Sequence, residues 1–327
     1  MCRNRFPGAA GWIRSGRHAS GRSMETWVVI TVAAAFFQNI RSSMQKHLKG
    51  VMGTTGATFV RFGYGIPFAL LYLGLLVLLF GKPLPTPNAG FFLWATIGGL
   101  AQITAQFLLV HLFSFRNFAV GTAYSRTEPA QAALFGLIVL GERATLGTML
   151  AIVISVFGVM LISVARTVVS LRALATSVAS RTALIGLLSG TFFGLSAVSY
   201  RSASLALAPT LPEPDYMTQA SFTLAFVILL QTVLMLGWML ARDRAELVRV
   251  GMAWRPALVV GFVGATASFG WFMAMTLQQA AVVKALAQVE MLFTFASTVF
   301  VFKESINRLE IAGCLLIVLG VLLLLVA

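Results

Sequence analysis

The sequence predicts an all-α integral membrane protein with ten transmembrane helices, arranged as two inverted five-helix repeats. Its mean hydropathy is +0.89 and only 10% of its residues are charged, whereas about a quarter of the residues in a soluble domain carry charge. Apolar runs near the ~20 residues that a helix needs to cross a bilayer recur along the chain. The later half of the chain also repeats the earlier half. An odd number of spans in each copy places the two copies in opposite orientations.

The repeat is clearest in the glutamates. Glu128 and Glu142 are followed, 162 residues later, by Glu290 and Glu304. Apolar matches carry little information in a chain that is 58% hydrophobic, but the chain holds only eight glutamates. Inverted repeats are typical of secondary transporters, whose binding sites lie near the bilayer midplane between the copies. The duplication therefore already indicates transport.

The composition divides the chain into four segments. Residues 1–24 form a basic tail, which we expect to be disordered, and Met24 is an alternative start of translation. Residues 25–166 form the first repeat with spans one to five, and residues 167–181 are a linker. Residues 182–327 form the second repeat with spans six to ten.

Each apolar run is predicted to be a helix, because backbone groups in lipid must be hydrogen-bonded within their own segment. The predicted spans are 27–46, 56–81, 90–112, 117–141, 145–165, 182–205, 216–240, 256–276, 280–302 and 308–327. Several connections between them are only a few residues long. No soluble domain therefore fits between the spans.

The first span carries a polar arc. Gln38, Arg41 and Ser42 fall within a narrow sector of this helix, which predicts that the sector faces a polar cavity. Arg41 lies toward the end of its span, as do Arg61 and Arg201 in the second and sixth spans. For these three arginines the alternative is that the side chain snorkels to the lipid headgroups.

Prolines and glutamines mark the next spans. Pro67 and Pro129 predict kinks in the second and fourth spans, because proline has no amide proton to donate and neighbouring helices can satisfy the freed groups. Gln102 and Gln106 lie one turn apart in the third span. They either face the cavity or form bonds between helices.

The fourth and ninth spans each carry a glutamate near the middle. A charge at this depth costs several kcal/mol unless it is paired or hydrated, so Glu128 and Glu290 are candidate functional residues. Tyr124 and Gln131 share the helix face of Glu128. The alternative is a buried structural ion pair between Glu128 and Arg126 or an arginine of a neighbouring helix.

A second polar stripe runs beside these glutamates. Thr122 and Arg126 correspond to Lys284 and Gln288 in the second copy, so each repeat contributes one cation to this stripe. The predicted substrate or coupling cavity is lined by Gln38, Arg41, Tyr124, Arg126, Glu128, Gln131, Lys284, Gln288 and Glu290.

The fifth and tenth spans begin with residues that favour helix N-termini. Thr145 and Asn307 are good N-caps, and Asn307 with Glu310 has the spacing of a capping box. Glu142 and Glu304 precede these helix starts, where the helix dipole favours an anion, and we predict turn and capping roles for both.

Glycines at every fourth position mark the sixth span. Gly186, Gly190 and Gly194 form a double GxxxG pattern, which predicts a close approach of another helix backbone.

The motifs late in each repeat resemble the EamA family of the drug/metabolite transporter superfamily, whose members have ten spans. In the first copy the motif residues are Pro129, Gly141, Glu142, Thr145 and Gly158. In the second copy Met291 and Lys303 replace the proline and the first glycine, while Glu304, Asn307 and Gly320 remain. The resemblance covers nearly all of residues 25–327 and implies the fold. It does not specify the solute.

The predicted function is that of a secondary transporter, which exports or exchanges a small metabolite by alternating access. Five cations lie within the spans, against the two midspan glutamates, and this balance favours an anionic or amino-acid-like solute. The cations are Arg41, Arg61, Arg126, Arg201 and Lys284. We predict that Glu128 carries a coupling proton and that Glu290 is its pseudo-symmetric partner. The alternatives are an uncoupled facilitator of the same fold and, in another class, an integral-membrane lipid-modifying enzyme.

Other chemistries find little support in the sequence. It shows no phosphate loop, no cluster of metal ligands and no Ser-His-Asp set, so we expect no catalytic residues, metal or cofactor. The net charge of +14 comes without a basic stripe interleaved with aromatics, which argues against nucleic-acid binding. Cys2 and Cys314 form no disulfide framework. The expected partners are a small solute, the lipid bilayer and protons, and the oligomeric state stays open.

Two arguments about membrane orientation disagree. Counting the loop lysines and arginines by the positive-inside rule places both termini outside the cell. The family resemblance implies cytoplasmic termini and a location in the bacterial cytoplasmic (inner) membrane.

Overall fold

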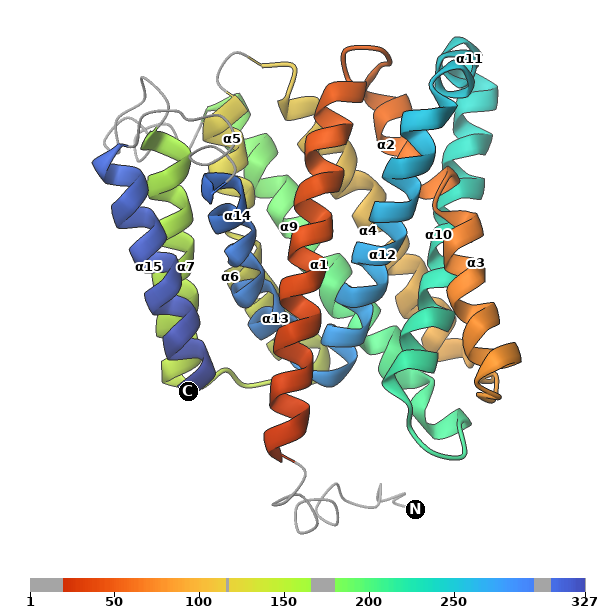
Figure 1. The fold of residues 1–327 in the computed structure, drawn as a ribbon, viewed down its shortest axis with the longest axis horizontal. Helices are drawn as coiled ribbons and strands as arrows, with labels where there is room; N and C mark the ends of the chain where they lie inside the picture. The colour runs from red at the N-terminus through yellow and green to blue at the C-terminus, as the bar shows by residue number, and fades with distance from the viewer. Residues whose placement is uncertain (1–19, 116–117, 166–179, 297–306, 327) are drawn as a thin grey trace, which may run out of the picture.

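The computed structural model describes residues 20–115, 118–165, 180–296 and 307–326. All regular elements in these ranges are helices, and most of them run along one common direction to form a bundle (Figure 1). The helices of the first copy are α1 (Ser20–Leu48), α2 (Thr54–Gly63), α3 (Ile66–Gly74), the π-helix η2 (Leu75–Leu79), α4 (Ala89–Leu112), α5 (Phe118–Ser125), α6 (Glu128–Leu140) and α7 (Leu146–Ala165). The later helices are α9 (Arg181–Ala206), the 3₁₀ turn η3 (Ala208–Thr210), α10 (Tyr216–Arg242), α11 (Arg244–Met252), α12 (Trp254–Leu277), α13 (Ala280–Leu286), the 3₁₀ turn η4 (Ala287–Val289), α14 (Glu290–Ala296) and α15 (Arg308–Val326).

Seven helices in the described part of the chain are long and apolar enough to cross a membrane. They are Thr54–Leu79, Ala89–Leu112, Leu146–Ser163, Arg181–Thr210, Tyr216–Arg242, Trp254–Leu277 and Arg308–Val326. The predicted integral membrane character is thus supported, while the count of ten spans is not confirmed. The other three predicted ranges hold α1, which is long but carries polar residues, and two helices that are broken near their middle.

The two broken helices break at equivalent places. The fourth predicted span is divided into α5 and α6 between Ser125 and Glu128, with Pro129 in the first turn of α6. The kink predicted at this proline is confirmed, as is a break before Pro67 at the start of α3. In the second copy the 3₁₀ turn Ala287–Val289 interrupts the ninth span. No proline stands there, so the break does not depend on one.

Opposite chain directions relate the two copies. Helix α1 runs from the end of the bundle where α15 finishes toward the other end, whereas α9 runs the opposite way (Figure 1). Helices α7 and α15 lie against each other and are antiparallel in the same view. Helix α1 begins at Ser20, within the range predicted as a tail. Residues 1–19 and most of the predicted linker, as well as Lys303 and Glu304, lie outside the described residues.

Glycines allow the closest helix contacts. A side chain at Gly186 would overlap the backbone of Gly121, and one at Gly190 would meet the carbonyl of Ser125. Helix α9 therefore packs directly on α5, as its double GxxxG pattern predicts. Gly158 and Gly313 face each other in the same manner where α7 meets α15.

The predicted helix caps of α7 and α15 are present. The Thr145 hydroxyl accepts the Thr148 amide at 3.0 Å, and Glu310 accepts the Asn307 amide at 3.0 Å. At the end of α6, Gly141 has a φ of +68°, and the Glu142 amide donates to the Gly136 carbonyl. The Gly141 amide also donates to the Leu137 carbonyl, so this left-handed glycine ends the helix in an αL cap, which explains the glycine of the Gly-Glu pair.

Candidate functional site

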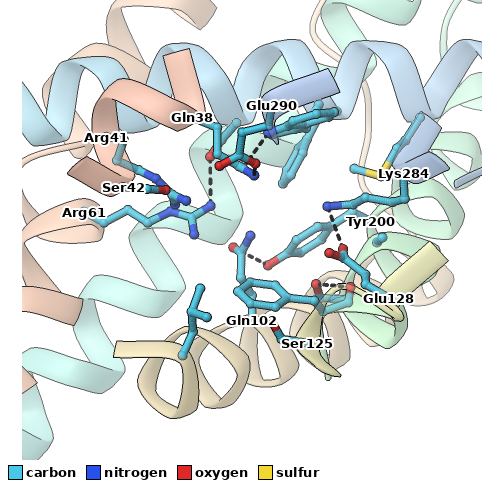
Figure 2. Close-up of a pocket in the computed structure, with 18 of the residues that line it drawn as sticks. Gln38, Arg41, Ser42, Arg61, Gln102, Ser125, Glu128, Tyr200, Lys284 and Glu290 are labelled. Carbon is cyan, nitrogen blue, oxygen red and sulfur yellow. Dashed lines mark hydrogen bonds and ion pairs between the residues drawn. The ribbon is translucent and has the colours of Figure 1, made fainter. Parts of the chain in front are cut away.

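A polar cavity of about 60 Å³ lies inside the bundle, beside the two helix breaks. This volume accommodates a few water molecules or a small polar group and is too small for a drug-sized ligand. Six of the nine residues predicted to line a cavity are on its wall: Gln38, Arg41, Arg126, Glu128, Lys284 and Glu290. Both copies of the repeat contribute to it (Figure 2).

Glu128 opens helix α6 and points toward the second copy. Its Oε1 lies 2.8 Å from Lys284 Nζ on α13, as an ion pair without hydrogen-bond geometry. The Glu128 side chain retains 18% of its exposure. The Lys284 ammonium also lies 5.1 Å from the centre of the Trp271 ring, within the range of a cation–π interaction. Among the described residues, the ion-pair partner of Glu128 is therefore this lysine.

Glu290 opens helix α14 and points toward the first copy. Its Oε2 accepts hydrogen bonds from Arg126 Nη1 at 3.2 Å and from Gln38 Nε2 at 3.0 Å. The Gln38 oxygen in turn accepts the Trp271 ring N–H at 2.9 Å. The Glu290 side chain is only 4% exposed. This carboxylate is thus held by several donors in a buried setting.

The two ion pairs are reciprocal between the copies. Each glutamate binds a cation of the other copy: Glu128 binds Lys284, and Glu290 binds Arg126. The alternative of a structural pair between Glu128 and Arg126 is therefore wrong in its partner. Arg126 lies in the break between α5 and α6 and reaches Glu290, 164 positions away.

Arg41 and Arg61 both point inward. Each is 4% exposed and lines the cavity, so the alternative that they snorkel to headgroups is wrong. Arg61 donates to the Gln106 side-chain oxygen at 2.8 Å and to the Ser268 hydroxyl at 3.3 Å. Polar acceptors on α4 and α12 thus retain Arg61 within the bundle.

Arg201 does not snorkel either, and its partners were not expected from the sequence. It forms an ion pair with Glu142 at 2.6 Å and donates to the carbonyls of Met275 and Gln278 at the end of α12. A cation at a helix C-terminus is stabilised by the helix dipole. Glu142, predicted to act in a turn, therefore also ties the end of α6 to α9.

Three of the predicted cavity residues lie beside the cavity instead of on its wall. Tyr124 packs with Ala123 and Ala183, Gln131 donates to the Thr127 hydroxyl at 2.8 Å, and Gln288 donates to the Arg126 carbonyl at 3.2 Å. The shared face of Tyr124, Glu128 and Gln131 was assigned from regular helical spacing, although a kink was expected at Pro129. The break between Ser125 and Glu128 separates Tyr124 from the helix of Glu128, and the 3₁₀ turn holds Gln288 apart from the helix of Glu290, whereas Gln131 lies on the same helix as Glu128 and bonds to Thr127 at its start.

Several residues on or beside the cavity wall were not among the nine predicted to line it, although Gln102 was expected to face either the cavity or another helix. Tyr200 donates to Gln102 at 2.9 Å, and Gln231 donates to both of them. Ser125, Ser268 and the aromatic rings of Phe193, Trp271 and Phe272 complete much of the wall. Single polar residues spread over separate apolar helices give no periodic signal. Their convergence depends on helix packing.

The charges on the cavity wall are unsuited to a metal cation. Four cationic side chains face two carboxylates: Arg41, Arg61, Arg126 and Lys284 against Glu128 and Glu290. Within the described residues no group of three or more His, Cys, Asp or Glu side chains could hold a metal ion. The cavity therefore has a surplus of positive charge.

Comparisons with known proteins agree with this architecture. A solved crystal structure, entitled only "Crystal structure of protein", superposes with a TM-score of 0.61 at 15% identity, covering 89% of this chain and 97% of that chain. No curated protein matches the chain. The model of the EamA-like transporter family matches residues 25–164 and again residues 180–326. The chain therefore belongs to the EamA-like transporter family, whose members are membrane transporters of the drug/metabolite type.

Proposed function

We propose that this protein is a secondary transporter that moves a small metabolite by alternating access between two inverted five-helix repeats. The observation that carries the proposal is the pair of reciprocal ion pairs, Glu128–Lys284 and Arg126–Glu290, at the breaks of two equivalent helices. Transporters commonly bind their solutes at discontinuous helices between repeats. The opposite directions of α1 and α9 support the inverted arrangement (Figure 1).

The ion pairs provide a physical route to alternation. Both join the two copies across the cavity, so one copy rocks against the other only when the pairs loosen or exchange partners. A solute with charged groups competes for these residues and lowers the cost of separating them. The helix breaks supply hinge points, because their backbone lacks the continuous hydrogen-bond ladder of an intact helix.

Glu128 is the proposed proton carrier of the pair. Its carboxylate has one ammonium partner and greater exposure than Glu290, which is bound by Arg126 and Gln38. Protonation of Glu128 would remove its attraction to Lys284 and free that ammonium for a solute or for movement. A transporter coupled in this way responds to the pH on the side to which the cavity opens.

The test measures solute release from vesicles. Purified protein is reconstituted into liposomes that are loaded with a cell metabolite extract, and released compounds are identified by mass spectrometry at several pH values. We expect the wild type to release a small set of solutes faster as the pH gradient grows. Glu128→Gln keeps the shape and hydrogen-bonding capacity of the side chain but cannot titrate, so the pH dependence should vanish.

The control is Glu213→Gln, which neutralises an exposed carboxylate between α9 and α10 and should leave release and its pH dependence unchanged. If Glu128→Gln and Glu290→Gln both retain the wild-type pH dependence, neither residue couples protons. Release that does not respond to pH in the wild type would instead indicate an uncoupled facilitator. Liposomes that release nothing beyond the rate of protein-free liposomes would contradict the transport function itself.

A further inference from the structure

We propose that Arg41 and Arg61 form the anion-binding end of the cavity and take a carboxylate or phosphate group of the transported solute. This inference rests on the proposed transport function and assigns a substrate class to the same site. The two arginines come from adjacent elements of the first copy, α1 and α2. In Figure 2 they lie together on one side of the cavity, opposite the Glu128–Lys284 pair.

Arg41 is buried with unused hydrogen-bonding capacity. The side chain is 4% exposed, lines the cavity, and its Nε has no hydrogen-bond partner among the described residues. A buried guanidinium N–H without an acceptor costs free energy unless a ligand or water supplies one. The Glu290 carboxylate lines the same cavity, but its Oε2 already accepts hydrogen bonds from Arg126 and Gln38.

Arg61 is held in position by neutral groups. Its hydrogen bonds reach the Gln106 oxygen at 2.8 Å and the Ser268 hydroxyl at 3.3 Å, and the guanidinium lies 5.4 Å from the centre of the Phe62 ring. None of these partners offsets its positive charge. The contacts orient the guanidinium and leave the charge available to an anion.

The side chains of Arg41 and Arg61 both pass close to Gly264 on α12. A Cβ atom added at Gly264 would lie 3.4 Å from Arg41 Cδ and 3.4 Å from Arg61 Cγ. The two side chains therefore pass over the same stretch of helix, and both guanidinium groups belong to one cavity of about 60 Å³. Two cations placed this close repel each other unless an anion lies between or beside them.

The chemistry of the pair selects the ligand class. Guanidinium groups match carboxylate and phosphate oxygens through paired, charge-assisted hydrogen bonds. The two carboxylates on the cavity wall are already paired with Arg126 and Lys284, so the surplus of two positive charges resides at Arg41 and Arg61. A small anion would neutralise this surplus. The narrow cavity excludes a large one.

The competing explanation is that both arginines only brace the helices, since Arg61 links α2 to α4 and α12. A binding measurement separates the two roles. The thermal unfolding midpoint of detergent-purified protein is followed at constant ionic strength with sodium succinate, sodium phosphate, the neutral diamide succinamide, or sodium chloride alone. A ligand that binds only the folded state raises this midpoint as its concentration rises.

We expect succinate or phosphate to raise the midpoint in the wild type, and succinamide to have no effect. The more effective of the two anions identifies the carboxylate or phosphate chemistry. Arg41→Gln and Arg61→Gln should each weaken the apparent affinity about tenfold, which corresponds to losing one charge-assisted interaction. Arg41→Lys keeps the charge and should retain part of the response. The matched control Arg255→Gln removes an exposed cation from α12 and should bind as the wild type does.

Ser268→Ala keeps the proposal testable if an arginine variant fails to fold, because it removes one contact of Arg61 without changing any charge and should weaken binding by a smaller factor. Unchanged anion responses in both arginine variants, or no response of the wild type to either anion, would overturn the proposal. The liposome assay keeps the two ideas apart. If Arg41→Gln releases solute as the wild type does, the transport function holds and the anion site is not needed for it. If the protein binds anions but releases no solute, the transport function is contradicted and the anion site is not.

Discussion

Glu128 and Glu290 occupy equivalent positions in the two copies, but their surroundings differ. Each is the first residue of a half-helix after a break. Glu290 is 4% exposed and accepts hydrogen bonds from Arg126 and Gln38, whereas Glu128 is 18% exposed and, among the described residues, forms its ion pair with the Lys284 ammonium. Arginine binds a carboxylate through a rigid planar group, and lysine through a compact and flexible one.

This difference shows how a duplicated unit acquires two roles. The duplication preserves the place of the glutamate, but the cation sits at a different register in each copy: two residues before Glu128 and six before Glu290. The copies therefore carry one carboxylate that is held by Arg126 and Gln38 and one that is paired with Lys284 and is more exposed. We infer that the Glu290 side maintains the fold of the interface while the Glu128 side responds to protons.

The largest expected effect is a difference in unfolding free energy between the variants Glu290→Gln and Glu128→Gln. Glu290→Gln leaves Arg126 without its buried counter-ion, and breaking a buried ion pair in this way costs about 3 kcal/mol. Glu128→Gln should cost about 1 kcal/mol, because this carboxylate is more exposed and less fully bonded. The measurement is the free energy of unfolding of purified protein in mixed micelles. Equal losses in the two variants would break the comparison.

A smaller effect is expected from the glutamines beside each carboxylate. Gln38→Leu removes a charge-assisted hydrogen bond to Glu290 and the acceptor of the Trp271 N–H, so unfolding should become easier by about 2 kcal/mol. The matched change Gln131→Leu removes only a donor to the Thr127 hydroxyl in the first copy and should cost about 0.5 kcal/mol. The same unfolding assay compares them. A larger loss of unfolding free energy for Gln131→Leu than for Gln38→Leu would contradict the inference that Glu290 is the more firmly held carboxylate.

The smallest expected effect on stability comes from the ion pair between Lys82 and Asp215, which lies outside the spans. This partly solvated pair is a reference for the buried pairs at the cavity. Asp215 lies 3.4 Å from Lys82 and accepts the Thr218 hydroxyl at 2.6 Å. Partial burial opposes ionisation, but the Thr218 hydrogen bond and the Lys82 charge together lower the pKa of Asp215 below its usual value. Because Lys82 is 42% exposed, solvent screening should limit the pair to about 0.5 kcal/mol.

The sign of the pH dependence follows from this lowered pKa. Asp215 contributes stability above its unfolded-state pKa, and the contribution is lost as the pH falls through the lower folded-state value. Asp215→Asn should therefore be slightly less stable than the wild type at neutral pH and should approach it in acid. Unfolding midpoints measured from neutral pH down to about 3 test this. A difference that grows in acid would contradict the assignment.

Much of the architecture could be predicted from the sequence, because the relevant signals are local. Hydropathy identifies apolar helices, Pro129 marks a break, and Thr145 and Asn307 mark helix starts through hydrogen bonds to amides two or three residues away. The midspan glutamates are conspicuous because charge is costly in lipid. The count of ten spans is not confirmed by hydropathy and length alone, because polar residues of the site lower the hydropathy of α1 and accompany the breaks in the fourth and ninth spans.

Only the tertiary structure decided which charges meet. Sequence periodicity assigns side chains to the faces of one helix at a time, and it says nothing about how that helix is rotated against its neighbours. The pairing of Arg126 with Glu290, and of Arg201 with Glu142 and the end of α12, therefore became visible only in the packed structure. Arg41 and Arg61 turned inward because the packed bundle offers polar partners and a cavity there. These pairings depend on contacts between segments far apart in the chain, which form only when the helices pack together.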